Sequence, residues 1–173
     1  MEIALEILKY VLPAAIVFVG VYFIMQNFME NEQKKLEMRY RTDSMKAVTP
    51  VRLQAYERII LYLERINLSN LVMRTYQKGM SARDLQAKML GSIRSEYEHN
   101  MAQQLYVSSK VWRMVKSSKE ETIKVINSCS EQLSDEASGV ELSQFILELV
   151  GKTEKLPTEV AIEGLKREIN YAF

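Results

Sequence analysis

Tyr10–Met29 reads YVLPAAIVFVGVYFIMQNFM and contains twenty consecutive residues without a charged side chain. Ionisable residues bracket this stretch at Lys9 and Glu30. An α-helix rises about 1.5 Å per residue, so about 20 residues cover the roughly 30 Å hydrocarbon core of a bilayer. The sequence therefore predicts one transmembrane helix over residues 10–29.

Two other interpretations of this stretch are a cleaved signal peptide and a buried core helix. A signal peptide favours a basic N-terminal region, a short apolar core and small residues at the cleavage site. Here Glu2 and Glu6 accompany Lys9 before the stretch, and bulky Phe28 and Met29 end it. These features favour a retained membrane anchor.

The basic residues after the apolar stretch predict its orientation. Only Lys9 and the amino terminus precede the stretch. Because cytoplasmic flanks carry an excess of Lys and Arg, we expect an outer N-terminus and residues 30–173 in the cytoplasm. The single cysteine, Cys129, agrees with a reducing compartment. The membrane-proximal basic residues are Lys34, Lys35, Arg39, Arg41 and Lys46.

The residues after the anchor predict an all-α fold. Residues 30–48 are polar with sparse apolar positions, which favours a basic stalk that continues the membrane helix. Residues 49–173 contain clear helix start and stop signals and almost no strand pattern. We therefore expect an N-terminal segment at residues 1–29, a stalk at 30–48, and a cytoplasmic bundle of about five helices at 49–173.

Local signals predict the boundaries of the first two bundle helices. Thr49 followed by Pro50 is typical of an N-cap and a first helical position. Asn67-Leu68-Ser69 interrupts this helix, and Gly79 would follow the last turn of the next one. One buried face is expected on the first helix, at Tyr56, Ile59, Ile60, Leu63 and Ile66.

Three serines, each followed by an acidic residue three positions later, predict later helix starts. Ser81 opens a long helix that we expect to reach about Lys116. Ser118 predicts a new helix or a kink, and Ser138 predicts another helix. Leu156-Pro157 predicts the last helix. The pairs are Ser81 with Asp84, Ser118 with Glu121, and Ser138 with Glu141.

Charge is divided unevenly along a chain whose net charge is +1. Residues 34–94 hold 13 Lys and Arg against 5 Asp and Glu, whereas residues 120–173 hold 5 against 11. Three interpretations stay open: a solvated face, a surface for anionic lipid, or basic and acidic surfaces that meet within the chain or between subunits. No nucleic-acid-binding module accompanies the basic residues, so we expect no nucleic-acid partner.

The pattern Glu96-x-x-His99 is the one place that suggests catalytic chemistry. This spacing can point both side chains at one metal ion, but dinuclear carboxylate bundles need a second such motif and further glutamates. The chain has one histidine, so a homodimer with Glu57 or Glu64 would have to complete the site. The alternative is that His99 holds its neighbours by hydrogen bonds. A pair of Cys129 with His99 has no supporting motif, and we expect no enzymatic activity and no cofactor.

Two strings resemble a family of small single-span membrane proteins of Bacteroidota that carry a domain of unknown function. They are VRLQAYERIILYLERIN at residues 51–67 and EYEHNMAQQLYVSSKVW at residues 96–112. The likeness extends over nearly the whole chain and includes a last helix at Glu159–Asn170. It implies a membrane anchor and a bacterial inner-membrane setting, and it implies no activity.

The resemblance singles out polar residues on two helices. We expect these helices to pack antiparallel through an apolar seam, with one tyrosine from each, and through a polar network. Arg58 or Arg65 would supply the cation of that network, and Glu96 or Glu98 would supply the anion. The tyrosines are Tyr56 and Tyr97, and the other residues are Arg52, Gln54, Glu57, Arg58, Glu64, Arg65, Asn67, Glu96, Glu98, His99, Asn100, Gln103 and Gln104.

These features predict a membrane-anchored helical scaffold or adaptor, or an accessory subunit of an inner-membrane complex. Its partners would be the bilayer, through residues 10–29, and either a second copy of the chain or another membrane protein. Two alternatives come from other functional classes. One is a metal-dependent or hydrolytic enzyme built on Glu96 and His99, and the other is a module that binds anionic lipid through the basic half.

Overall fold

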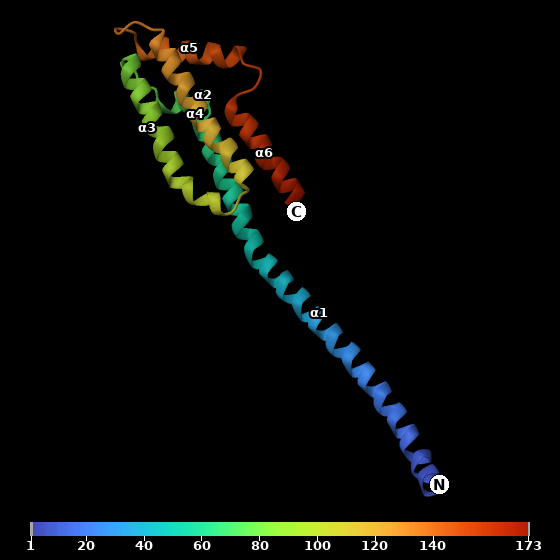
Figure 1. Ribbon diagram of the computed structural model, residues 1–173. Helices are drawn as coiled ribbons and strands as arrows, with labels where there is room; N and C mark the ends of the chain where they lie inside the picture. Colours follow the sequence, from blue (N-terminus) through green and yellow to red (C-terminus); the bar gives the residue numbers. More distant parts are fainter. Residues whose placement is uncertain (1, 173) are drawn as a thin grey trace. The chain divides into compact units, whose positions relative to one another are not determined.

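The computed structural model describes residues 2–172, with the side chains of residues 2–8, 10–12, 14 and 172 outside the described part. Within residues 2–172 the chain forms six α-helices, one 3-10 helix and no strand (Figure 1). The predicted all-α fold class is confirmed. The elements are α1 (Glu2–Ile66), α2 (Leu68–Thr75), α3 (Ala82–Asn100), η1 (Met101–Leu105), α4 (Ser109–Glu131), α5 (Gly139–Lys152) and α6 (Pro157–Ala172).

The chain divides into two compact units between Thr49 and Pro50. Unit 1 is residues 1–49, and unit 2, residues 50–173, contains the end of α1 and all later helices. The predicted helix start at Thr49-Pro50 is wrong, because α1 continues through both residues. Proline removes one helical hydrogen bond, here to the carbonyl of Lys46. Since Lys46 and Pro50 are both exposed, water can reach the freed carbonyl.

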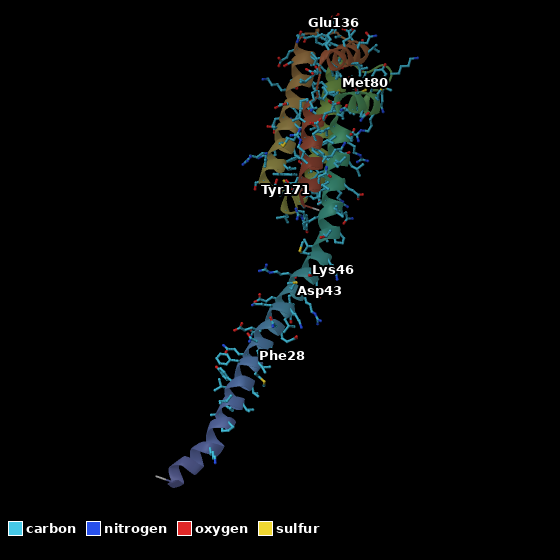
Figure 2. All side chains as sticks on the ribbon, turned by 90° about the vertical axis from the view of Figure 1, so that its right-hand side faces the viewer. Phe28, Asp43, Lys46, Met80, Glu136 and Tyr171 are labelled. Atoms are coloured by element: carbon cyan, nitrogen blue, oxygen red, sulfur yellow. The ribbon has the colours of Figure 1, made fainter. Side chains whose placement is uncertain are left out.

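Unit 1 consists of helix whose described side chains are exposed, apart from the partly buried Glu32 and Thr49. Figure 2 shows Phe28, Asp43 and Lys46 along this helix. Among the described residues, no helix has both the length and the apolar character that a bilayer crossing requires. Four residues of the predicted span, Tyr10, Val11, Leu12 and Ala14, lie outside the described side chains.

The core of unit 2 forms around the last part of α1. Tyr56, Ile59, Leu63 and Ile66 are 0–1% exposed, which confirms their predicted burial on one helix face. Tyr62 is buried as well, although the sequence pattern did not single it out. Fully burying one such aliphatic side chain contributes roughly 1.5–3 kcal/mol, so this face is a major source of stability.

The later helices pack on this core and on each other. Helix α6 packs along α4, α3 contacts both α4 and α5, and α2 contacts α3 and α5. Helix α5 runs across one end of the bundle in Figure 1. Their fully buried side chains include Leu71 of α2, Leu85, Met89 and Ile93 of α3, Val115 and Ile126 of α4, Leu142 and Ile146 of α5, and Leu165 of α6.

Two of the three predicted capping boxes form, and they lie against each other. The Ser81 and Ser138 side chains each accept a hydrogen bond from the backbone N–H three residues later, and their acids complete the boxes. The Ala82 N–H donates to the Ala137 carbonyl at 2.8 Å, and the Gly139 N–H donates to the Met80 carbonyl at 2.7 Å. These bonds join the N-termini of α3 and α5, and Figure 2 places Met80 and Glu136 at this end of the bundle.

The region between α3 and α4 differs from the prediction of one helix reaching Lys116. Helix α3 ends at Asn100, η1 follows, and α4 begins after Ser108, whose Oγ accepts a hydrogen bond from the Val111 N–H at 3.2 Å. The predicted start or kink at Ser118 is also wrong, since α4 runs through it. Ser118 faces the core at 1% exposure, so its Oγ is not placed at a helix terminus.

Gly79 does not follow the last turn of α2, because that helix ends at Thr75 with Tyr76 as its C-cap. Gly79 instead has φ +87° in the turn between α2 and α3. A backbone at positive φ favours glycine because a Cβ atom crowds the following carbonyl.

Two glycine-to-alanine substitutions are therefore expected to change stability in opposite directions. Gly79→Ala should lower the free energy of unfolding by about 1–2 kcal/mol because its φ is positive. Gly91→Ala, within α3 and with open space at its Cβ position, should raise it by about 0.5–1 kcal/mol. Urea unfolding of both variants measures this, and a loss of stability in Gly91→Ala would contradict the assigned helix.

Candidate functional site

Five of the residues singled out by the sequence line a groove between α1 and α3. Its volume is about 430 Å³. One wall comes from α1 positions spaced i, i+3, i+4 and i+7, which share a helix face, and the other from neighbouring positions of α3. This α1–α3 groove is lined by Arg58, Leu61, Tyr62, Arg65, Ser95, Glu96, His99 and Asn100.

The two walls run antiparallel. Arg65 of α1 contacts Glu96, and the rings of Tyr62 and Tyr97 are 6.1 Å apart. Earlier in α1, Arg52 Nε donates to the Tyr106 carbonyl at 3.2 Å. Residue numbers rise along one segment as they fall along the other, as expected for the two helices.

A cluster of two arginines and one glutamate lies at one end of the groove. Arg65 Nη1 donates to Glu96 Oε1 at 2.9 Å and to Oε2 at 3.1 Å, and Arg74 Nη1 donates to Oε1 at 3.1 Å. Arg74 Nη2 also donates to the Ser92 hydroxyl and to the Arg65 carbonyl. The Glu96 side chain is 17% exposed, so its charge is largely enclosed by these partners.

The pKa of Glu96 lies below its ordinary value. Partial burial raises this pKa, but the hydrogen bonds and charges of Arg65 and Arg74 outweigh that effect. The carboxyl group therefore contributes stability above the pKa it has in the unfolded chain. That contribution is lost as the pH falls through the lower pKa of the folded state.

Glu96 and His99 do not form the start of a metal site in this arrangement. Both carboxylate oxygens of Glu96 are bound by guanidinium groups, and His99 Nδ1 lies 2.8 Å from the Ser95 carbonyl. Within the described part of the chain, no group of three or more His, Cys, Asp or Glu side chains is placed to hold a metal. Cys129 is buried, and burial raises the pKa of its thiol, which disfavours a nucleophilic role.

Arg52 and Tyr56, which the sequence singled out, belong to a different cluster. Ser108 and Glu168 are its other members. Tyr56 Oη donates to Glu168 Oε1 at 2.7 Å and accepts from Arg52 Nη2 at 3.1 Å. The Ser108 N–H donates to Glu168 Oε1 at 2.9 Å, and its hydroxyl donates to Oε2. This Glu168 cluster joins α1, the start of α4, and α6.

Electrostatic effects in the Glu168 cluster favour the ionised carboxylate. Burial raises the pKa of Glu168, but hydrogen bonds from Ser108 and Tyr56 and the charge of Arg52 bring it below its ordinary value. Burial and the hydrogen bond to Glu168 raise the pKa of Tyr56. A neutral tyrosine and a charged glutamate are therefore stable together at neutral pH.

The expected contact between Tyr56 and Tyr97 is replaced by one between Tyr62 and Tyr97. Tyr56 turns instead toward α6, where Glu168 accepts a hydrogen bond from its hydroxyl. The Tyr97 ring also stacks on Trp112 at 5.8 Å, and Lys119 Nζ lies 4.3 Å from its centre. The apolar seam between α1 and α3 therefore continues into α4 as an aromatic layer.

The remaining predicted residues lie mostly outside both clusters. Asn67 caps α2, with its Oδ1 accepting from the Ser69 N–H at 3.1 Å. Asn100 Nδ2 donates to the Glu96 carbonyl at 2.8 Å. Exposed side chains without a hydrogen bond or ion pair to any described residue are Gln54, Glu57, Glu64, Glu98 and Gln104, and Gln103 is half-buried.

The five predicted membrane-proximal basic residues, all in unit 1, are exposed. Lys35 pairs with Glu32 at 2.8 Å and Lys46 with Asp43 at 3.7 Å, each three residues along the same helix. Lys34, Arg39 and Arg41 form no ion pair with a described residue. Isolated surface pairs of this kind contribute about 0–1 kcal/mol, so these cations have little role in holding the fold.

A family model described as a family of unknown function, DUF7935, matches residues 2–172. The chain belongs to the DUF7935 family. The predicted membership of a family of unknown function is thereby confirmed. No curated protein matches the sequence, and no solved structure matches it either. The residues matched by the DUF7935 model include both walls of the groove and the Glu168 cluster.

A double-mutant cycle on Arg65 and Glu96 tests the ion pair. Arg65→Gln and Glu96→Gln, singly and together, should show a coupling of about 0.5–1 kcal/mol in the free energy of unfolding at pH 7. The coupling should fade as the pH falls and Glu96 becomes protonated. The matched cycle on Arg65 and Glu98 should show none, since Glu98 is exposed and unpaired among the described residues. Equal coupling in both cycles would contradict the observed pairing.

Proposed function

We propose that this protein is a membrane-anchored helical adaptor whose unit 2 binds a partner at the membrane surface. One observation carries the proposal: eleven large apolar side chains between Ile16 and Met29 are 51–73% exposed. Water-exposed apolar surface of this extent is rare in soluble monomers and marks contact with lipid or protein. The segment therefore requires a covering that the rest of the described chain does not supply.

The distribution of these side chains favours lipid over a protein partner as that covering. They occupy nearly every position from Ile16 to Met25, so apolar surface surrounds the helix on all sides. A helix that is apolar all round is typical of a buried or membrane-spanning segment, whereas a protein interface favours one stripe. In the sequence, Tyr10, Val11, Leu12 and Ala14 complete the uncharged run to twenty residues.

The basic residues after the run support a cytoplasmic position for unit 2. Lys34, Arg39 and Arg41 are exposed and pair with no described acid, as expected for residues that fix topology. The family resemblance supports a bacterial inner membrane of the Bacteroidota as the setting. In this proposal the N-terminus faces outward.

The contacts in unit 2 favour binding over catalysis. The acids that the sequence marked for chemistry hold arginines, as Glu96 does, or lie exposed without partners, as Glu57 and Glu64 do. Partly buried polar clusters such as that of Glu168 favour one packing when their members are satisfied. A rigid helical surface of this kind suits an adaptor, scaffold or accessory subunit, with a second copy or a membrane protein as partner.

Alkaline extraction of membranes tests the anchor. Full-length protein should stay in the membrane fraction at high pH, whereas Val17→Glu/Val21→Glu/Ile24→Glu should move to the supernatant. Each charged side chain near the centre of a membrane helix makes the free energy of membrane insertion less favourable by roughly 2.5–3.5 kcal/mol. The matched triple variant Met38→Glu/Tyr40→Glu/Met45→Glu, at exposed apolar positions outside the run, should stay in the membrane. Extraction of the wild-type protein by alkali would overturn the proposal.

A further inference from the structure

The carboxylate and two backbone carbonyls of the α1–α3 groove already have hydrogen-bond partners. Glu96 Oε1 accepts two guanidinium bonds and Oε2 accepts one. The Ser95 carbonyl lies 2.8 Å from His99 Nδ1, and the Glu96 carbonyl accepts from Asn100 Nδ2 at 2.8 Å. The one carboxylate of the groove is therefore already engaged by guanidinium groups.

Donors in the same groove are left over. Arg58 forms no hydrogen bond or ion pair with any described residue, although it lines the groove. Arg65 uses only Nη1, so its Nε and Nη2 donate to no described side chain or carbonyl. Each guanidinium offers five N–H donors in a planar fork. The groove thus keeps free guanidinium donors, whereas its one carboxylate is occupied.

The charge balance of the groove is positive. Glu96 is the one acidic residue in its lining, and it is shared by Arg65 and by Arg74. The acids next to the lining positions in sequence, Glu57, Glu64 and Glu98, do not line the groove and pair with neither arginine. The charge of Arg58 is consequently uncompensated within the described structure.

The dimensions of the groove suit a small ligand. Its volume of about 430 Å³ falls within the roughly 300–1,000 Å³ that small-molecule sites occupy. Arg58 and Arg65 lie seven positions apart, which places them on one face about 10 Å apart along the helix axis. Leu61, which is 61% exposed, lies between them and offers apolar contact.

We infer that the α1–α3 groove binds a small ligand through an oxyanion, a phosphate or a carboxylate, with Arg58 as its principal contact. An oxyanion accepts hydrogen bonds from the free guanidinium donors, and its charge offsets that of Arg58. The guanidinium fork matches both groups with two parallel hydrogen bonds. The apolar part of the ligand would lie along Leu61. This inference does not depend on the adaptor function, because the groove lies entirely within unit 2.

Trp112 provides a built-in reporter for this site. It is the single tryptophan of the chain, and it stacks on Tyr97, whose ring contacts Tyr62 of the groove. Full-length protein in non-ionic detergent would be titrated with inorganic phosphate and with succinate, against sodium chloride at matched ionic strength. Tryptophan fluorescence and isothermal titration calorimetry would follow binding.

We expect a saturable response to phosphate, to succinate or to both that chloride does not reproduce. Arg58→Gln should raise the dissociation constant about tenfold or more, as expected for losing a charged hydrogen bond. Arg58 is exposed and unpaired, so this variant should keep its thermal midpoint. The matched control is Arg94→Gln, an exposed arginine of α3 outside the groove, and its affinity should equal that of the wild type.

Nanodiscs distinguish a lipid headgroup from a free anion as the source of the oxyanion. If the source is a headgroup, discs containing phosphatidylglycerol should shift the fluorescence of the wild type but not of Arg58→Gln, and inorganic phosphate should reverse the shift. If the source is a free anion, its affinity should be the same in zwitterionic and anionic discs. The inference is overturned if neither anion nor anionic lipid gives a response, or if Arg58→Gln responds like the wild type.

Discussion

The burial of one face of the last part of α1 is the constraint on which the rest of unit 2 depends. Ile59, Leu63 and Ile66 are each 0% exposed, and the helices that follow bury their own apolar side chains against this face. With that face buried, the helix period leaves Arg58, Leu61 and Arg65 on its exposed flank. The wall of the α1–α3 groove is thus a direct consequence of the core packing.

Local patterns predicted the parts of the fold that local forces decide. The 3.6-residue spacing located the buried face of α1, and the capping boxes at Ser81 and Ser138 located the starts of α3 and α5. The same signals failed where packing or chain context decides the outcome. Pro50 follows a typical N-cap residue yet lies within α1, and Ser118 precedes Glu121 at capping distance yet faces the core.

The candidate site was predictable only in part, for a related reason. Arg65 and Glu96 were among the residues expected to pair, because the family resemblance singled out the polar residues of their two helices. Arg74 and Glu168 were missed, since each meets its partners through long-range packing: Glu168 lies 112 positions from Tyr56. The tyrosine that contacts Tyr97 was also misassigned, because sequence spacing does not decide which helix faces which neighbour.

Residue-resolved hydrogen exchange of the full-length protein tests most directly whether tertiary burial holds the last part of α1. Residues 55–66 lie in the core, whereas residues 31–48 are helical and almost entirely exposed. Amides in residues 55–66 should exchange only through near-global unfolding, and those in residues 31–48 at least about 100-fold faster through local opening. Equal protection of the two segments would show that tertiary burial does not hold the last part of α1.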